Sequence, residues 1–143
     1  MKSAGFTLIE LLVALAIFAI ISAIAVPLYT DYTQRGYRTE VMSDLLVCAQ
    51  ALERFNAINF TYVGANPGGD GAPLDSTMCS PNSVAQGRYS ITAVTTATNY
   101  ELTALPAGPM AGDGALTLDE AGNRTWDEGN DGLGATDNDW EEG

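Results

Sequence analysis

Near its start the chain carries an apolar run of 21 residues, Phe6-Thr-Leu-Ile-Glu-Leu-Leu-Val-Ala-Leu-Ala-Ile-Phe-Ala-Ile-Ile-Ser-Ala-Ile-Ala-Val26, in which Glu10 is the only charged side chain. At about 1.5 Å per residue, a helix of this length crosses the hydrocarbon core of a bilayer, which is about 30 Å thick. Lys2, which stands before the run, favours a cytoplasmic N-terminus and export of the remaining chain.

Glu10 argues against two simpler interpretations of this run. A secretory signal peptide has an uninterrupted apolar stretch and a small-residue cleavage site, and Ile24-Ala25-Val26-Pro27 is a poor version of that site. A plain membrane anchor has no use for a carboxylate, which costs a few kcal/mol at the centre of a membrane helix. The presence of Glu10 therefore indicates that this segment has a function in which the carboxylate binds a partner.

Length, charge and composition limit the classes of function that this chain can have. The 143 residues fit one domain, and 18 acidic against 6 basic residues give a net charge of −12. Nucleic acid is therefore an unlikely direct partner, because phosphate contacts need clustered Lys and Arg. The chain has no histidine, which removes Ser-His-Asp and Cys-His catalysis and most zinc sites. An anchored periplasmic enzyme would need a carboxylate pair, and none is placed specifically.

The apolar run predicts the first half of one long helix, from Phe6 to about Ile58. In its second half, apolar side chains recur at spacings of three and four and form one stripe, made of Val41, Leu45, Cys48, Leu52 and Phe55. Pro27 and Gly36 are weak points, so we expect the helix to be kinked or frayed between them.

The rest of the chain predicts a small antiparallel sheet. Residues 59–86 are rich in Gly, Pro, Asn and Ser and are expected to form a loop. Strands are expected at 88–94, 100–105 and 115–118, with a possible fourth at 124–126. Three or four strands leave one face that the helix stripe covers, which gives an α+β fold with the hydrophobic half of the helix projecting.

The segment Gly5-Phe6-Thr7-Leu8-Ile9-Glu10-Leu11-Leu12, with its short basic leader and Pro27, resembles the class III signal of type IV pilins and type II secretion pseudopilins. The resemblance implies that a prepilin peptidase cuts between Gly5 and Phe6 and that Phe6 is N-methylated. It also implies that Glu10 of an incoming subunit meets the Phe6 amine of a neighbour, that Pro27 kinks the helix, and that Tyr29 and Tyr32 belong to the usual pattern.

Four further stretches are similar to type IVa, PilE-like pilins: Cys48–Phe55, Tyr100–Pro106, Gly114–Asp119 and Gly122–Asp127. The implied organisation is a leader (1–5), a transmembrane and filament-core helix (6–27) and a globular head (28–143). Within the head, the expected parts are a helix half (28–58), a loop (59–86), a sheet (87–126) and an acidic loop (127–143).

The resemblance implies a structural subunit, major or minor, that catalyses nothing. It would wait in the bacterial inner membrane with its C-terminus in the periplasm and assemble with other pilins, through an inner-membrane platform, into an extracellular helical filament. Adhesion, twitching motility and DNA uptake follow by analogy with pili in general. The alternative is a pseudopilin of a type II secretion system, which would form a short periplasmic piston.

The two cysteines, Cys48 on the helix stripe and Cys79 in the loop, are expected to pair in an oxidising periplasm. The alternative is one buried and one exposed free thiol. Many such pilins close their C-terminal region with a second disulfide. This chain has no further cysteines for one, so that region must be held by other means.

The segment from Asp127 to Glu142 has seven acidic residues and no basic ones. Asp127, Asp131, Asp137 and Asp139 faintly resemble an oxygen-rich calcium loop, although Gly129 and Asn138 depart from the EF-hand pattern. Calcium is a weak candidate ligand here, and no other cofactor is expected. The alternative is a solvated acidic tail.

Overall fold

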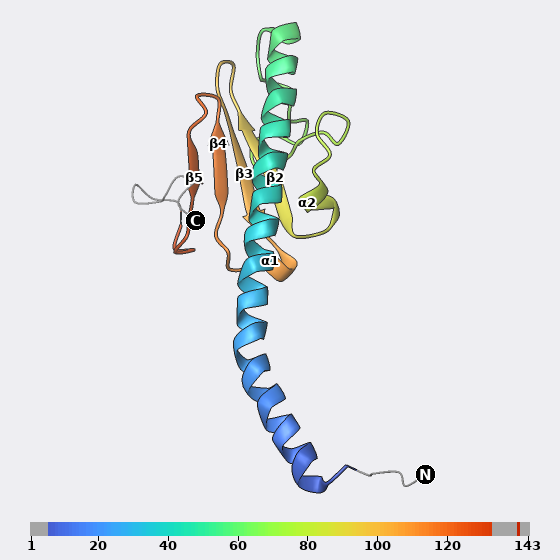
Figure 1. The fold of residues 1–143 in the computed structure, drawn as a ribbon. Helices are drawn as coiled ribbons and strands as arrows, with labels where there is room; N and C mark the ends of the chain where they lie inside the picture. The colour runs from blue at the N-terminus through green and yellow to red at the C-terminus, as the bar shows by residue number, and fades with distance from the viewer. Residues whose placement is uncertain (1–5, 133–139, 141–143) are drawn as a thin grey trace. The chain divides into compact units, whose positions relative to one another are not determined.

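The computed structural model describes residues 6–132 and 140. The chain divides into two compact units, Met1–Gln34 and Arg35–Gly143, and we call the second unit the head. The helix α1 (Leu8–Asn59) contributes to both units. All the strands lie in the head (Figure 1).

The predicted long helix is confirmed, and α1 ends one residue beyond the expected Ile58. It is helical through Pro27 and Gly36 without interruption, so the chain does not fray there in this structure. A kink at Pro27 stays a prediction. Directly after the C-terminal end of α1, Phe60 takes a positive φ of 57° and donates its N–H to the carbonyl of Asn56. This is a left-handed helix cap, a position that glycine usually occupies.

The predicted apolar stripe of α1 forms one wall of the core. Val41, Leu45, Cys48 and Leu52 have no exposed surface, and Phe55 packs against them while partly buried. Their neighbours in the core come from the inner face of the sheet and include Ile91, Leu102 and Leu116. Burying a side chain of this size stabilises the fold by about 1.5–3 kcal/mol, so the contact between α1 and the sheet contributes substantially to the stability of the head.

The sheet has five antiparallel strands in the order β1-β2-β3-β4-β5. Their bounds are β1 (Ala72–Pro73), β2 (Tyr89–Thr95), β3 (Tyr100–Pro106), β4 (Leu116–Asp119) and β5 (Arg124–Trp126). The four predicted strands are confirmed. The two-residue β1 was missed because it contains a proline and has no alternating pattern. A short helix, α2 (Asn82–Ala85), and a 3-10 turn (Gly108–Met110) were also missed.

Buried residues alternate with more exposed ones along β2 and β3, as the strand period requires. In β2 the buried residues are Tyr89, Ile91 and Ala93. Ser90 and Val94, which point to the opposite face, are exposed. On the other face the register aligns four threonines across four strands, Thr92, Thr103, Thr117 and Thr125. The apolar side chains of the sheet are thereby directed towards the helix.

Polar side chains of α1 fasten α2 and the start of β2. The Asp44 carboxylate accepts hydrogen bonds from both the backbone N–H (2.9 Å) and the hydroxyl (2.5 Å) of Ser83. Glu40 forms an ion pair with Arg88 and accepts a hydrogen bond from Asn82. The residues between the helix and the sheet are thus tied to α1 over much of their length.

The predicted disulfide is confirmed between Cys48 and Cys79, whose Cα atoms lie 5.2 Å apart. Both cysteines are buried in the core. The bridge therefore fastens the middle of the segment that follows α1 to the apolar stripe of the helix.

Gly114 is required where β4 begins. Its φ is +88°, and a Cβ atom built there would lie 1.7 Å from the carbonyl oxygen of Asp127. The approach is close because the next residue, Ala115, accepts the backbone N–H of Asp127 at 2.9 Å. Any side chain at this position would push the end of β5 away from β4.

Loss of the disulfide should destabilise the head by about 3–4 kcal/mol, since the bridge closes a 31-residue separation in the unfolded chain. Denaturant unfolding of the full chain in detergent, with and without a reductant, measures this difference. The double variant Cys48→Ala/Cys79→Ala is the control and should not respond to the reductant. An equal midpoint for the oxidised and reduced wild type would contradict the prediction.

Gly114→Ala should cost several kcal/mol of unfolding free energy, because the new methyl group would collide with the carbonyl of Asp127, the residue after β5, and because alanine is strained at a positive φ. Gly122→Ala is the matched control: its φ of +84° is nearly the same, and nothing lies within 4 Å of its Cβ position. The control should lose only about 1 kcal/mol. Equal losses in thermal or denaturant unfolding would show that the close contact is unimportant.

Candidate functional site

The first turn of α1 is closed by a reciprocal cap between Thr7 and Glu10. The Glu10 carboxylate accepts hydrogen bonds from the Thr7 backbone N–H (3.2 Å) and hydroxyl (3.0 Å), and the Thr7 hydroxyl accepts the Glu10 backbone N–H (3.3 Å). This is a capping box, which satisfies backbone donors that the start of a helix leaves unpaired. Glu10 thus has a partner within its own chain.

Sequence reasoning found Glu10 but missed Thr7. The signal was present, because Thr-x-x-Glu before an apolar run is the sequence signature of a capping box. Phe6, the residue expected to carry the new amino group, directly precedes Thr7 and is 90% exposed. Gly5, on the other side of the expected cleavage site, lies outside the described residues.

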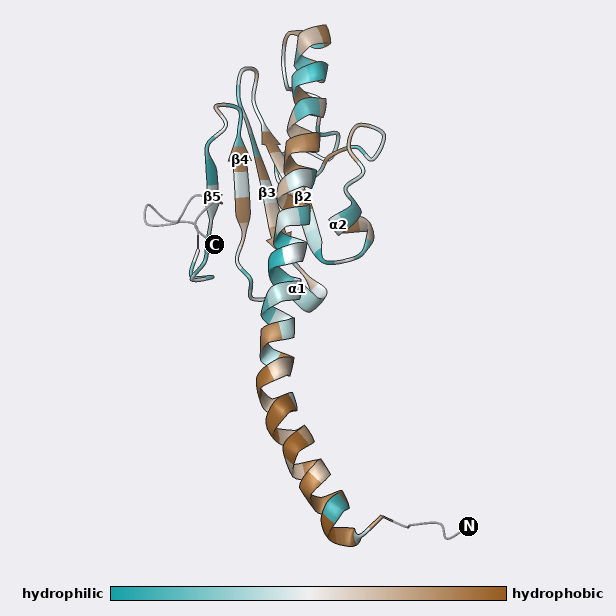
Figure 2. Ribbon diagram, in the orientation of Figure 1, coloured by the Kyte–Doolittle hydropathy of each residue, from teal (hydrophilic) through white to brown (hydrophobic). Residues whose placement is uncertain are grey.

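The apolar side chains that follow the cap point away from any protein core. From Leu8 to Leu28 the large ones are all more than half exposed. Among the described residues, α1 is the helix long and apolar enough to cross a membrane, with a mean hydropathy of 2.8 over its best 18-residue window. Figure 2 shows this hydrophobic stretch, interrupted by one hydrophilic turn near its start. The segment needs an apolar environment that the free chain does not supply.

Two threonine hydroxyls bond helix carbonyls next to Pro27 and just after it. Thr30 donates its hydroxyl to the carbonyl of Val26 (3.1 Å), and Thr33 donates to the carbonyl of Thr30 (2.8 Å). Such bonds satisfy helix carbonyls locally and are associated with bending.

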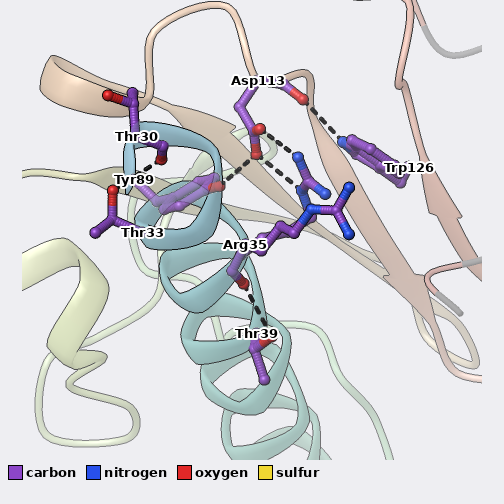
Figure 3. Close-up of polar contacts among 8 residues, drawn as sticks. Thr30, Thr33, Arg35, Thr39, Tyr89, Asp113 and Trp126 are labelled. Atoms are coloured by element: carbon purple, nitrogen blue, oxygen red, sulfur yellow. Dashed lines mark hydrogen bonds and ion pairs between the residues drawn. The ribbon is translucent and has the colours of Figure 1, made fainter. Parts of the chain in front are cut away.

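A buried polar cluster in the head joins α1 to the end of the sheet (Figure 3). The Arg38 guanidinium donates two hydrogen bonds to the Asp113 carboxylate (2.5 and 3.1 Å), which also accepts the Tyr89 hydroxyl (2.9 Å). The indole of Trp126 donates to the Asp113 carbonyl (2.8 Å), and Arg38 lies 3.7 Å from the centre of its ring. Burial raises the pKa of Tyr89, and the neighbouring Asp113 carboxylate raises it further. The Tyr89 hydroxyl therefore stays protonated and acts as a donor.

Near the C-terminus, Trp140 is attached to β5. Trp140 is buried, donates its indole N–H to the Thr125 carbonyl (3.1 Å) and lies under the Arg124 guanidinium at 5.2 Å. The sequence showed no pattern that links the residues of the buried cluster, because Arg38, Asp113 and Trp126 are far apart in the chain.

The acidic loop begins with a buried carboxylate that binds backbone. Asp127 is 4% exposed and accepts the N–H groups of Asp131 (3.1 Å) and Gly132 (3.0 Å). Asp137 and Asp139 lie outside the described residues. Within the described part of the chain, no three acidic or cysteine side chains are grouped as metal ligands. Calcium binding by this loop stays a prediction.

Comparison with known proteins places these features in a family. Residues 27–118, well over half of the chain, match the family model described as "Type IV minor pilin ComP, DNA uptake sequence receptor". Residues 1–26 match the prokaryotic N-terminal methylation motif.

Individual relatives carry pilus names. The chain is 34% identical over 93 residues to "Prepilin peptidase-dependent protein D" of Escherichia coli K12, covering 64% of both chains. It is 47% identical over 49 residues to a "Fimbrial protein" of Pseudomonas aeruginosa, covering 34% of this chain and 32% of that one. It is 36% identical over 87 residues to "Type IV major pilin protein PilE1" of Neisseria gonorrhoeae, covering 59% and 36%.

The chain thus spans less than two thirds of the length of each of these relatives. No solved structure matched it. The two family matches together extend from residue 1 to residue 118, across the capped apolar helix and most of the sheet. The chain belongs to the type IV pilin family, whose members are structural proteins of the pilus and not enzymes.

Proposed function

We propose that this pilin waits in the bacterial inner membrane and is assembled into an extracellular type IV pilus. The observation that carries the proposal is the exposed apolar segment of α1, which is closed at its start by the Thr7–Glu10 cap directly after the methylation motif. Such a segment is stable in a bilayer or against other apolar helices. A subunit that leaves the membrane must therefore enter a bundle of like helices.

Processing by a prepilin peptidase belongs to the same proposal. The match to the methylation motif and the name of the Escherichia coli relative support cleavage between Gly5 and Phe6 and N-methylation of Phe6. Cleavage would leave a cationic amine one residue before Thr7. In the filament, the Glu10 carboxylate would meet such an amine from a neighbouring subunit, and an inner-membrane platform would drive the transfer.

The names of the relatives favour a pilus over a secretion pseudopilus, and they include both minor and major pilins. Adhesion, twitching motility and DNA uptake are the activities to which such a pilus would contribute. The family description includes a DNA uptake sequence receptor.

Direct recognition of DNA by this head has little electrostatic support. Of the five arginines in the described residues, only Arg35 and Arg54 are exposed, and they lie 19 positions apart on α1. Proteins that bind duplex DNA strongly neutralise about 6–10 phosphates. Nucleic acid is therefore not expected to be a primary partner of this subunit.

Filaments sheared from the native host test the proposal most directly. Mass spectrometry should find a chain that begins at N-methylated Phe6 and is two hydrogens lighter than the free-thiol mass, because Cys48 and Cys79 are bridged. An abundant species indicates a major pilin and a trace species a minor one. Detection of the chain only in the membrane fraction would contradict assembly into a surface pilus.

Glu10→Val should leave membrane insertion intact but strongly reduce incorporation into filaments, because the paired charge is lost. Glu10→Gln separates the two roles of this side chain, since glutamine retains the capping box but cannot pair as an anion. We expect Glu10→Gln to assemble nearly as poorly as Glu10→Val, measured as the ratio of sheared to membrane-bound subunit. Thr7→Ser, which retains the cap and the charge, is the control and should assemble normally. Normal assembly of Glu10→Gln would assign Glu10 to capping alone.

A further inference from the structure

Two carboxylates bracket an uncharged segment in the apolar half of α1 (Figure 2). Glu10 and Asp31 follow one another in the order of charged residues, and the 20 positions between them, 11–30, carry no charge. The segment is helical throughout. At about 1.5 Å per residue it extends for about 30 Å, which is the thickness of the hydrocarbon core of a bilayer. Residues 11–30 are therefore long enough to cross a membrane without including either carboxylate.

A second placement in the bilayer has nearly the same length. The apolar run itself, residues 6–26, has 21 positions, but it would carry the backbone of Glu10 about 6 Å below the surface of the hydrocarbon core. A carboxylate inside the hydrocarbon is unfavourable. The same placement would leave Leu28 outside the hydrocarbon. The two placements thus differ by four residues along the helix, and they expose different side chains to water.

The hydrogen bonds of Glu10 favour the placement in which residues 11–30 cross the membrane. Its carboxylate is directed towards the N-terminus, because it accepts both the backbone N–H and the hydroxyl of Thr7, three residues earlier. Helical side chains generally lean in this direction. Thr7 directly precedes Leu8, the first residue of α1. The cap therefore gathers the polar groups of the first turn at the end of the helix, where lipid headgroups and water can reach them.

The far end of the segment carries side chains that suit a membrane surface. Tyr29 and Tyr32 are 71% and 79% exposed, and tyrosine is enriched where the hydrocarbon core meets the headgroups. Asp31 lies between them in the sequence and is also exposed. Thr30, the last uncharged position, donates its hydroxyl to the Val26 carbonyl, so this polar group is satisfied within the helix. Both ends of the segment are thus built for the boundary between lipid and water.

We propose that Glu10, held at the start of α1 by Thr7, lies at the cytoplasmic surface of the bilayer and sets the depth of the unassembled subunit. Residues 11–30 then cross the hydrocarbon core, and the two tyrosines lie among the periplasmic headgroups. Phe6, at which the proposed cleavage occurs, lies outside the core on the cytoplasmic side. The proposal rests on the proposed function, because the membrane-inserted subunit is the starting state of assembly.

Cysteine labelling of the full-length, uncleaved chain distinguishes the two placements. Cys48 and Cys79 are bridged and are the only cysteines, so one added cysteine is the only free thiol. Leu8→Cys and Leu28→Cys are a matched pair, because these leucines are 76% and 63% exposed and neither is hidden by the chain. The membranes come from a host without the peptidase and are opened, so that a water-soluble maleimide reaches both surfaces.

Leu8→Cys should react about tenfold faster than Leu28→Cys, because the reactive species is the thiolate and an apolar environment suppresses its formation. Ile20→Cys, near the middle of the segment and 64% exposed in the structure, is the reference for full protection by lipid. Equal rates for the first two variants, or the opposite order, would overturn the proposal.

Glu10→Leu tests whether this carboxylate sets the depth, since it removes the only charge between Lys2 and Asp31. In the Glu10→Leu background the first turn can enter the hydrocarbon, so labelling of Leu8→Cys should fall several-fold. Glu10→Asp retains the charge and is the matched control, in which labelling should stay as in the wild type. Unchanged labelling of Leu8→Cys beside Glu10→Leu would show that other residues set the depth, and would overturn the proposal.

Processing and assembly are read separately from depth. In a host with the peptidase and the assembly machinery, mass spectrometry shows whether the wild-type chain begins at Phe6 and enters filaments. A chain that is labelled in the expected order but is neither cut nor assembled would contradict the proposed function and leave the depth assignment intact. A chain that is cut and assembled but labelled in the opposite order would overturn the depth assignment alone.

Discussion

Burial of the apolar stripe of α1 under the sheet is the interaction on which the structure of the head depends. Val41, Leu45, Cys48 and Leu52 have no exposed surface, and the sheet has no other helix of comparable length to cover its inner face within the described residues. A five-stranded meander of this size needs such a cover to be stable in water. The disulfide, the Arg38–Asp113 pair and the Asp44–Ser83 bonds all attach other segments to this same helix.

One helix therefore meets two different environments, and its side chains change accordingly. Before Pro27 nearly every position is apolar, so the segment suits a solvent that is apolar on all sides. After Gly36 the buried apolar positions form one stripe, and the exposed positions carry charged and polar side chains together with a few apolar ones such as Val47 and Ile58. The composition of α1 thus separates a part that binds lipid or other helices from a part that carries a folded head.

Much of this organisation could be predicted from the sequence because it follows from periodicity. The helix stripe, the four longer strands and the Cys48–Cys79 bridge all have local signals: spacing, alternation, or two cysteines and nothing else to pair with. Type IV pilin membership followed from one eight-residue motif and its context. The cap at Thr7 also has a local signal, the spacing Thr-x-x-Glu before an apolar run.

The features that could not be predicted depend on contacts between distant residues. Nothing near Arg38 in the sequence indicates that it would lie between Asp113 and Trp126. The two-residue β1 exists because Ala72 and Pro73 lie beside β2, and the α2 helix is docked by acidic side chains of α1. These elements have weak local preferences, and tertiary contacts decide their structure.

The Thr7–Glu10 cap has a consequence for the reversibility of the fibre. If Glu10 pairs with a neighbouring subunit as proposed, its carboxylate, which already accepts hydrogen bonds in the free subunit, would exchange partners and would not pass from an unpaired to a paired state. The net free energy of that exchange is smaller than the gain from pairing an unpaired carboxylate, because the hydrogen bonds of the cap are given up. Growth of the fibre would then gain less at this carboxylate, and retraction would have less to overcome there.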